Sequence, residues 1–166
     1  MSELSELFHH RWAVPLLAAL QKEKDLTYAA VSSALKLSRG AFNDTLAALN
    51  EQGLLDAQKK LTKKGEKVAE RAHALLAAAE KQGEVAWRKW SMPIVHALAK
   101  KPARFGQLKE ALKGVTPRAL SMAMKELLDA GLVERKVVDG FPPRAEYTLG
   151  PKAKALAPVL EQLAKL

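Results

Sequence analysis

The sequence contains no cysteine, and this absence excludes several kinds of chemistry at once. Without thiols the chain forms no disulfide, no cysteine–metal site and no thiol-based catalytic or redox-sensing centre. Long hydrophobic runs are also missing, because the longest run near the N-terminus covers only residues 13–20. That run is far too short to cross a membrane, and no convincing signal-peptide charge pattern precedes it. We therefore expect a cytoplasmic protein without a membrane partner.

Signatures of catalysis and of ligand binding are equally scarce. The four histidines do not suggest a metal site, since His9 and His10 are adjacent near the N-terminus while His73 and His96 lie far apart. The sequence has no glycine-rich phosphate loop, no nucleophile elbow and no metal-binding helix motif. We expect no enzyme activity, no cofactor and no metal. The sequence does not identify a small-molecule effector.

Positive charge is abundant and unevenly distributed. Lysine and arginine outnumber aspartate and glutamate by 27 to 18, which gives a net charge of +9 and favours a polyanionic partner. Residues 1–78 hold 11 basic and 9 acidic side chains, whereas residues 79–166 hold 16 and 9. The excess lies in the second half of the chain, although lysines on a merely solvated surface would give the same count. With 48% hydrophobic residues, the chain should fold on its own.

Residues 104–149 have the order helix, turn, helix and hairpin. The first helix is expected over residues 104–112, and Gly114 ends it. Its apolar face consists of residues at helical spacing: Phe105, Leu108, Ala111 and Leu112. Thr116 and Pro117 then predict the start of a second helix. A threonine hydroxyl can accept from a free backbone N–H, and proline suits the first helical position because it has no N–H to satisfy.

The second helix is expected to run from Pro117 to about Ala130. Gly131 follows it and supplies the left-handed residue found after many helix ends. The apolar stripe that should face the core consists of Leu120, Ala123, Met124, Leu127 and Leu128. The side chains on the opposite, outward face are Arg118, Ser121, Met122, Lys125 and Asp129.

A β-hairpin should follow the second helix, because the hydrophobic period changes from about 3.6 to 2. The two strands are expected over residues 132–138 and 144–149. They are joined by the five residues 139–143, and an Asp-Gly pair between alternating segments is a strong hairpin signal. This order is that of a winged helix-turn-helix, in which the second helix can lie in the major groove of DNA and the hairpin, or wing, reaches along the backbone.

Three segments together resemble one family of regulators. They are PRFGQLKEAL, GVTPRALSMAMKELLDAGLVER and PPRAEYTLGPKAKALAPVL. They are similar to the HxlR-type winged helix-turn-helix regulators of transcription over roughly residues 87–166. The resemblance implies that residues 116–122 begin the recognition helix and that residues 139–144 form the wing tip. The chain departs from this family in two ways: members often carry a cysteine before the first helix, and they usually contain one such module per chain.

The candidate DNA-binding residues lie on the outward helix face and on the wing: Thr116, Pro117, Arg118, Ser121, Met122, Lys125, Arg135, Lys136 and Arg144. Arg118 could bond guanine O6 and N7 as a pair, or it could hold a phosphate. Ser121 and Lys125 more naturally position the DNA backbone. Met122 could touch a thymine methyl group or fill a gap beneath the wing.

The wing cations have a second interpretation. Arg135 and Arg144 could contact phosphates or the minor groove, or they could form exposed ion pairs with Glu134 or Glu146. Tyr147 is expected to face the core.

The chain also repeats itself. Residues 11–20 align with 89–98, and 50–58 align with 128–136, both at an offset of 78. Residues 61–68 align with 149–156 at an offset of 88, so the first copy lacks ten residues of the wing. The sequence therefore predicts a mainly α protein with small β-hairpin wings, built as a tandem winged helix-turn-helix with a degenerate first copy at about residues 8–80.

We divide the chain into a degenerate unit with a short wing, residues 1–82, and a complete DNA-binding unit, residues 83–166. The first unit should contain a short amphipathic segment (Leu4, Leu7, Phe8) and helices over 13–22, 27–36 and 39–52, the last capped by Ser38 and stopped by Gly53. A cramped hairpin and a helix from Lys63 should follow. In the second unit a helix from Pro151, kinked at Pro158, should close the chain.

The first copy lacks the cationic reading face of the second. Its equivalent positions are Gly40, Asn43, Asp44 and Ala47. We expect this copy to act as a scaffold, effector site or partner surface, with Lys59, Lys60, Lys63 and Lys64 adding weak backbone contacts. The two copies could pack as an internal pseudo-dimer through residues 66–79, 84–89 and 157–166, or they could be independent units on a helical linker. The residues leave open whether the protein also forms a homodimer.

The favoured function is sequence-specific binding of double-stranded DNA by a transcriptional regulator, through helix 117–130 and wing 132–149. The alternative is a tandem winged-helix adaptor that binds protein in a chromosome- or polymerase-associated complex. The cations on the helix favour the first function, whereas the degenerate first copy favours the second.

Overall fold

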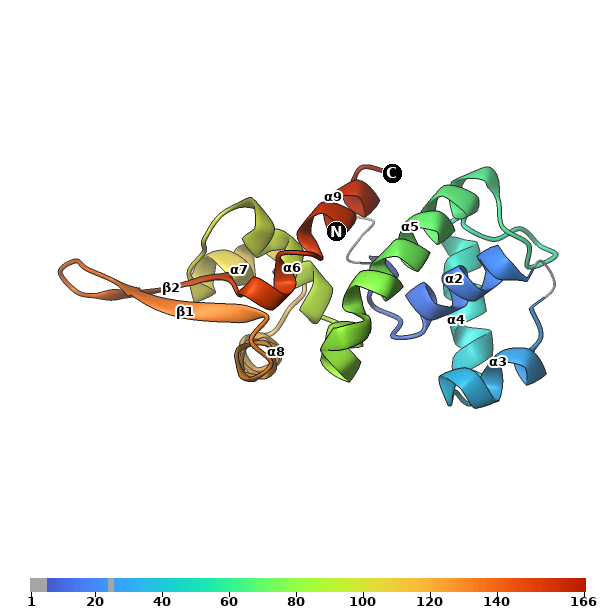
Figure 1. Ribbon diagram of the computed structural model, residues 1–166, viewed down its shortest axis with the longest axis horizontal. Helices are drawn as coiled ribbons and strands as arrows, with labels where there is room; N and C mark the ends of the chain where they lie inside the picture. Colours follow the sequence, from blue (N-terminus) through green and yellow to red (C-terminus); the bar gives the residue numbers. More distant parts are fainter. Residues whose placement is uncertain (1–5, 24–25) are drawn as a thin grey trace.

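The computed structural model describes residues 6–23 and 26–166. The chain forms an elongated, mainly helical molecule whose two halves lie side by side along its long axis, with a hairpin projecting from one end (Figure 1). The first half contains α2 (Ala13–Lys22), α3 (Tyr28–Leu35), α4 (Arg39–Glu51) and α5 (Lys63–Ala79). The second half contains α6 (Ser91–Lys100), α7 (Phe105–Ala111), α8 (Pro117–Asp129), β1 (Val133–Val138), β2 (Arg144–Leu149) and α9 (Ala157–Ala164). Two 3₁₀ segments, η1 (Glu80–Trp87) and η2 (Pro151–Ala153), connect these elements.

Polar caps begin the two central helices where the sequence predicts them. The Thr116 hydroxyl accepts a hydrogen bond from the N–H of Ala119 at 3.1 Å, at the start of α8. The Ser38 hydroxyl accepts from the N–H of Ala41 at 3.2 Å, at the start of α4. Each cap satisfies one of the backbone donors that a helix leaves free at its first turn. The predicted starts of both helices are therefore confirmed.

The predicted helix stops are confirmed as well. Gly53, Gly114 and Gly131 all have positive φ values, of 70°, 87° and 73°, in the left-handed region that glycine adopts without steric cost. Gly131 turns the chain directly from α8 into the hairpin, and the N–H of Leu132 bonds back to the carbonyl of Leu127 at 2.9 Å. This return bond fixes the base of the hairpin against the end of α8.

The hairpin is a two-stranded antiparallel ladder. Its register runs from Val133 opposite Leu149 at the base to Val138 opposite Arg144 near the tip. Val133 is the only buried residue of β1, and the strand is exposed from its second residue onward. The ladder therefore continues well beyond the body of the protein, as Figure 1 shows.

The first half also reverses direction after its central helix, α4, through a much shorter connection. The N–H of Leu54 bonds to the carbonyl of Leu49 at 2.9 Å, which matches the bond from Leu132 to Leu127 at an offset of 78. In place of two strands, a single bridge pairs Leu55 with Leu61. The cramped hairpin expected here is therefore a tight turn closed by one bridge.

One continuous core joins the two halves. Buried residues of both halves form a single hydrophobic cluster, and α5 packs against α2 on one side and α9 on the other. Polar contacts cross the same junction: Arg11 pairs with Glu84 at 3.4 Å, and the Arg71 guanidinium donates to Gln162 Oε1 at 3.0 Å. These contacts contradict the alternative of two independent units on a linker.

Several expectations for the last helices and for the burial of single residues were wrong. The helix expected from Pro151 is broken, because η2 ends at Ala153 and α9 begins only at Ala157. Pro158 lies in the first turn of α9, where its missing N–H costs nothing, so it starts a helix and does not kink one. Ala111 was expected on the buried face of α7 but is exposed. Leu4, expected in the first amphipathic segment, lies outside the described residues, whereas Leu7 and Phe8 are buried.

Candidate DNA interface

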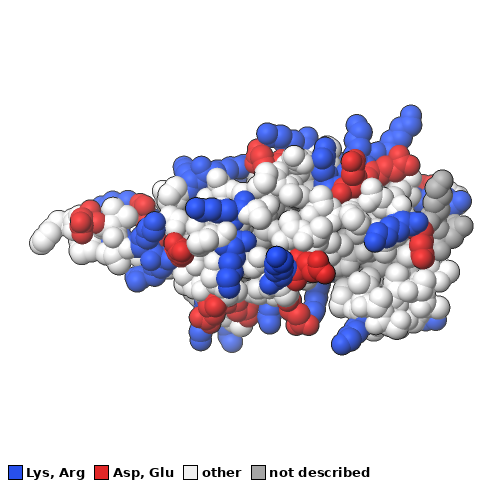
Figure 2. Space-filling model, viewed as in Figure 1, with Lys and Arg blue, Asp and Glu red and all other residues white. Residues whose placement is uncertain are grey.

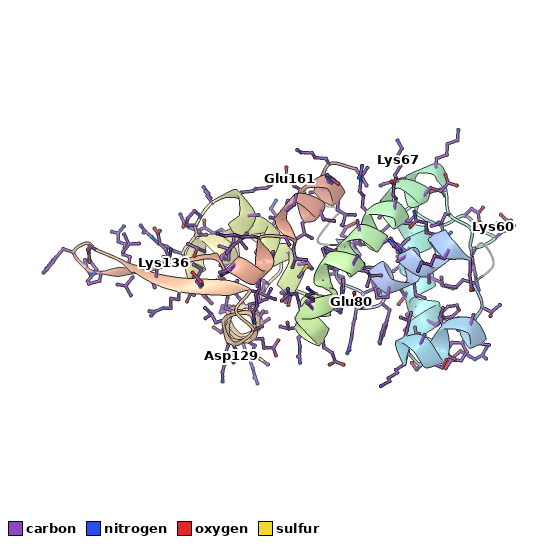
Figure 3. All side chains as sticks on the ribbon, viewed as in Figure 1. Lys60, Lys67, Glu80, Asp129, Lys136 and Glu161 are labelled. Carbon is purple, nitrogen blue, oxygen red and sulfur yellow. The ribbon has the colours of Figure 1, made fainter. Side chains whose placement is uncertain are left out.

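α8 lies with one face in the core and the other in solvent. Its buried side chains are Leu120, Ala123, Met124 and Leu127, as the apolar stripe predicts. Leu128, expected in the same stripe, is only half-buried. Figure 3 shows the labelled Asp129 of α8 and Glu161 of α9 at opposite edges of the second half of the molecule. The outward face of α8 therefore points away from the helices that join the two halves.

The outward face of α8 carries two cations over its first turns. Arg118 and Lys125 are both exposed, and among the described residues neither takes part in an ion pair. Seven residues of helix separate them by about 10 Å along the axis. The exposed Ser121 lies between them. Thr116 and Pro117, at the very start of the helix, are exposed too. The surface thus offers donors to a polyanion over about two turns.

Acidic groups flank this face without covering it. The carboxylate of Glu126 pairs with the guanidinium of Arg88 at 3.1 Å, which offsets its charge. Asp129 is exposed at the last residue of α8. A carboxylate at this end would repel phosphates, so contact with a polyanion is favoured at the first two turns.

Met122 lies in solvent and does not fill a gap beneath the wing. Its side chain is 56% exposed, which contradicts that interpretation. The other interpretation, an apolar contact made outside the protein, is compatible with this exposure. Met122 shares its outward surface with Arg118 and Lys125, so a partner that bonds the cations would also meet an apolar group.

The wing cations lie on both faces of the hairpin. Arg135 is opposite Tyr147 in the register and shares the face of the ladder that includes the buried Val133. Lys136 and Arg144 project from the other face, because side chains alternate along a strand. Figure 3 labels Lys136 on the projecting part of the wing. No single face of the wing gathers all three charges.

The ion pairs that were the alternative interpretation of the wing cations are not formed. Glu146 pairs instead with the guanidinium of Arg104, at 3.8 Å, and so links the wing to the residue that precedes α7. In the part of the chain that the structure describes, Arg135, Lys136 and Arg144 have no ion pair. Tyr147 is half-buried and packs against the core, as expected. The wing cations are therefore available to an external anion.

The sequence reasoning missed the apolar character of the wing tip. Phe141 is fully exposed, and Val137 and Val138 are 60% and 43% exposed. Figure 2 shows the outermost end of the wing without charged side chains, with charged side chains of both signs following farther along the hairpin. The available signal was an aromatic residue between Gly140 and Pro142, inside a turn that would ordinarily be polar.

The equivalent surface of the first half is exposed but poor in cations. Gly40, Asn43, Asp44 and Ala47 all face solvent from α4. Arg39 stacks on the ring of Tyr28, with 4.7 Å from its guanidinium carbon to the ring centre, so it is engaged within its own half. The lysines expected to add weak contacts are exposed on the tight turn and at the start of α5: Lys59, Lys60, Lys63 and Lys64.

The arrangement of the described residues also bears on metal binding and on membrane insertion. Over residues 6–23 and 26–166, no group of three histidine, aspartate or glutamate side chains is placed to hold a metal ion. No helix within the same ranges has the length and apolar character needed to span a membrane.

Comparison with known proteins places this interface in a family. The HxlR-like helix-turn-helix family matches residues 85–166, which include α6 to α9 and the whole wing. An HTH-type transcriptional regulator of Halalkalibacterium halodurans is 45% identical over 76 residues, covering 45% of this chain and 67% of the relative. The HTH-type transcriptional regulator YvaP of Bacillus subtilis is 38% identical over 86 residues, covering 52% of this chain and 80% of the relative.

Among solved structures, the reduced form of the transcriptional regulator YodB from Bacillus subtilis is similar to this chain. It is 29% identical, with a TM-score of 0.46, over 52% of this chain and 84% of that one. The chain therefore belongs to the HxlR-like helix-turn-helix family, whose relatives are named as transcriptional regulators.

Proposed function

We propose that this protein regulates transcription by binding double-stranded DNA in a sequence-specific manner, with α8 in the major groove and the wing against the neighbouring backbone. The observation that carries the proposal is the outward face of α8, where Arg118 and Lys125 are exposed and have no ion pair among the described residues. A helix of this width fits the major groove, and its first turns meet the base edges. Membership of a family of transcriptional regulators supports the same function over a protein-binding adaptor.

Each residue of the face has a proposed role. Arg118, in the first turn, bonds guanine O6 and N7 as a pair. Lys125 and Ser121 hold phosphates on either side of that contact, and Met122 touches a thymine methyl group. Thr116 and Pro117 set the start of the helix, whose free N–H groups attract a phosphate. The wing cations Arg135, Lys136 and Arg144 contact phosphates and add affinity through counterion release.

We further propose that the first half, residues 1–82, is a degenerate copy of the second, residues 83–166. Matching backbone hydrogen bonds support the duplication: Thr62 N to Leu54 O at 3.1 Å corresponds to Gly150 N to Leu132 O at 2.9 Å. Helices α4 and α8 have the same length of 13 residues and the same type of hydroxyl cap. The contacts between α5 and α9 support an internal pseudo-dimer.

A pseudo-dimer with one cationic reading helix would recognise one half-site per chain. Asp44 on α4 lies at the position that corresponds to Met122 on α8. A carboxylate that entered the DNA groove at this position would be repelled by the phosphates. A single chain would therefore select an asymmetric motif. A homodimer would select two half-sites, separated by about 34 Å or a multiple of it.

The experiment is selection of bound sequences from a pool of random duplexes at two salt concentrations. Wild type is compared with Arg118→Ala and with the matched control Lys165→Ala, which removes one positive charge near the C-terminus. Lys165 is exposed, and its ion pair with Glu161 on the same helix contributes little to stability. We expect the wild type and the control to enrich the same motif. Arg118→Ala should lose preference at one base pair, at a cost of about 1–3 kcal/mol.

The outcomes separate the possible roles of Arg118. Uniform weakening of all sequences by Arg118→Ala would make Arg118 a phosphate contact and leave base reading to other residues. Salt-sensitive binding without any enriched motif would reduce the function to nonspecific DNA binding. Failure of the wild type to bind any duplex at low salt would overturn the proposed function.

A further inference from the structure

Exposed large apolar side chains gather on the two elements of the proposed DNA interface. Within the described residues, five such side chains are exposed: Met122, Val137, Val138, Phe141 and Leu166. One of them lies on the outward face of α8 and three lie on the wing, whereas only the C-terminal residue lies elsewhere. Surface apolar groups scattered singly need no explanation, but this concentration on one functional surface does.

Phe141 is the extreme case. It lies in the turn between the strands, one residue after Gly140, and its side chain is fully exposed. The turn that carries it is the part of the wing farthest from the body (Figure 1). An aromatic ring held in water at the end of a projecting hairpin contributes nothing to the core. Its burial must come from a partner if it is buried at all.

The cations of the wing are placed so that they could meet phosphates on both sides of the hairpin. Arg135 projects from one face of the hairpin, and Lys136 and Arg144 project from the other. A surface with cations on a single face would suit a flat phosphate backbone. Cations on both faces suit a groove bounded by two phosphate strands, with the hairpin between them. The wing also carries three carboxylates: Asp139 in the turn, the exposed Glu134, and Glu146, which pairs with Arg104 outside the wing.

The length of the wing fits the spacing of grooves in DNA. Six strand residues at roughly 3.3 Å each carry the tip about 20 Å from the end of α8. The distance from a major groove to the next minor groove along B-DNA is about half of the 34 Å helical repeat, or about 17 Å. With α8 in the major groove, the tip of the wing therefore reaches the adjacent minor groove.

We propose that Phe141 acts as an apolar wedge that enters the minor groove and partly unstacks one base step, bending the duplex. This inference rests on the proposed function, because it takes DNA as the partner of α8. Inserted phenylalanine side chains unstack base steps in this manner in minor-groove proteins. Pyrimidine–purine steps deform most easily, so the wedge adds a preference for such a step about five base pairs from the centre of the α8 contact.

The test uses the full chain and the best duplex from the selection, with 2-aminopurine replacing single bases across the minor groove next to the α8 site. Fluorescence of 2-aminopurine reports unstacking, and gel mobility of circularly permuted fragments reports bending. The variants are Phe141→Ala, the conservative Phe141→Leu and the control Leu166→Ala, which removes an exposed apolar side chain outside the wing and α8. Thermal unfolding of each variant shows that the fold is retained.

We expect the wild type and Leu166→Ala to raise fluorescence at one step and to bend the fragment. Phe141→Ala should abolish both signals and weaken binding about five- to tenfold, and Phe141→Leu should restore much of each signal. Equal fluorescence and bending for wild type and Phe141→Ala would overturn the wedge, as would tight binding by the wild type without any unstacked step. A change in sedimentation of the protein alone, with DNA binding intact, would assign the tip to protein contact and overturn it too. Absence of DNA binding by the wild type would instead be a failure of the proposed function.

Discussion

His96 Nε2 lies 3.1 Å from Glu161 Oε2 and links α6 to α9 within the second half of the protein. Burial lowers the pKa of His96 below its usual value, despite the opposing effect of the hydrogen bond to Glu161. The same hydrogen bond, with a smaller contribution from Lys165, lowers the pKa of Glu161. The imidazole is therefore mostly neutral near pH 7, and the contact is a hydrogen bond from a neutral ring to a carboxylate.

The burial of His96 predicts that the protein loses stability in mild acid. The unfolded chain binds a proton on His96 at a higher pH than the folded protein does. The free energy of unfolding should therefore fall as the pH drops below about 6.5, and this loss should level off below the folded pKa. At lower pH, protonation of Glu161 acts in the same direction, because its pKa is also lowered on folding.

Urea unfolding of wild type and His96→Gln between pH 7.5 and pH 5 would measure the effect. Glutamine can still donate to Glu161, but it does not titrate, so the pH slope should become shallower. Some slope should remain, because burial and the nearby Lys89 also lower the pKa of His9. The exposed His73→Gln is the control. Identical slopes for wild type and His96→Gln would show that His96 does not carry the dependence.

The left-handed backbone conformation of Lys36 predicts a stabilising substitution at this position. Lys36 has φ 50°, and Gly114, 78 residues later, has φ 87° at the matching stop after α7. A non-glycine residue in the left-handed region costs about 1 kcal/mol or more. Lys36→Gly should therefore raise the free energy of unfolding by about 0.5–1 kcal/mol, even after the greater flexibility of the unfolded chain is included.

Gly114→Ala is the reciprocal change. Nothing lies within 4 Å of the position that its Cβ would occupy, so only the backbone conformation is penalised. We expect a loss of about 1 kcal/mol in chemical denaturation. A destabilising Lys36→Gly would mean that the lysine side chain makes contacts that outweigh its backbone strain.

The base of the wing should be intolerant of side chains at Gly150. A Cβ at this position would lie 2.1 Å from the carbonyl oxygen of Gly131 and 2.9 Å from its carbonyl carbon. The N–H of Gly150 also donates to the carbonyl of Leu132 at 2.9 Å. Gly150→Ala must therefore push β2 away from the end of α8, at a cost of about 2–3 kcal/mol.

The matched control for this change is Gly140→Ala at the tip of the wing, where the nearest atom to a new Cβ is 3.5 Å away. Circular dichroism melting should show a large shift for Gly150→Ala and little for Gly140→Ala. Comparable melting temperatures for the two variants would contradict the close packing at the hairpin base.

Local signals in the sequence were sufficient to predict the central helix and the wing. Thr116, Pro117 and Gly131 specify the two ends of α8 through hydrogen-bonding and backbone preferences that act within a few residues. The outward face of α8 followed from the helical period. These features depend on neighbours along the chain, so one sequence contains the information for them.

Features that depend on distant contacts were predicted less well. Within the wing, the sequence offered Glu146 only as a possible partner of the wing arginines, whereas it pairs with Arg104, which the fold brings beside β2. The helix from Pro151 was expected to be continuous, but it breaks before α9. Phe141 was treated as part of a turn, since its exposure depends on how far the hairpin projects. The roles of the nine candidate DNA-binding residues remain predictions.

The two-faced arrangement of the wing cations predicts how the salt dependence of binding should change. Each cation that contacts a phosphate releases one counterion, so its removal lowers the slope of log K against log salt by about 1. If the wing lies within a groove, Arg135→Ala and Lys136→Ala should each lower the slope, although the two side chains project from opposite faces.

Binding measured at several salt concentrations on one selected duplex would test this, with Lys165→Ala as the control for net charge. A wing lying flat on one backbone would give a smaller slope for only one of the two variants. That result would argue against entry of the tip into a groove, while leaving the role of α8 intact.

The difference between the two halves predicts opposite results at two equivalent positions, Asn43 on α4 and Ser121 on α8. Both side chains are exposed and 78 residues apart, and each lies on the outward face of its helix. Ser121 is flanked by the cations of α8, so Ser121→Ala should weaken DNA binding by about 0.5–1.5 kcal/mol through the loss of one hydrogen bond. Asn43 lies beside Asp44, which repels phosphate, so Asn43→Ala should leave both affinity and the selected motif unchanged.

Selection from random duplexes measures both variants, and a change of preference at one base pair in Asn43→Ala would show that α4 reads DNA. The first half would then contain a second DNA-recognition helix. The selected site would have to contain two contacts from one chain.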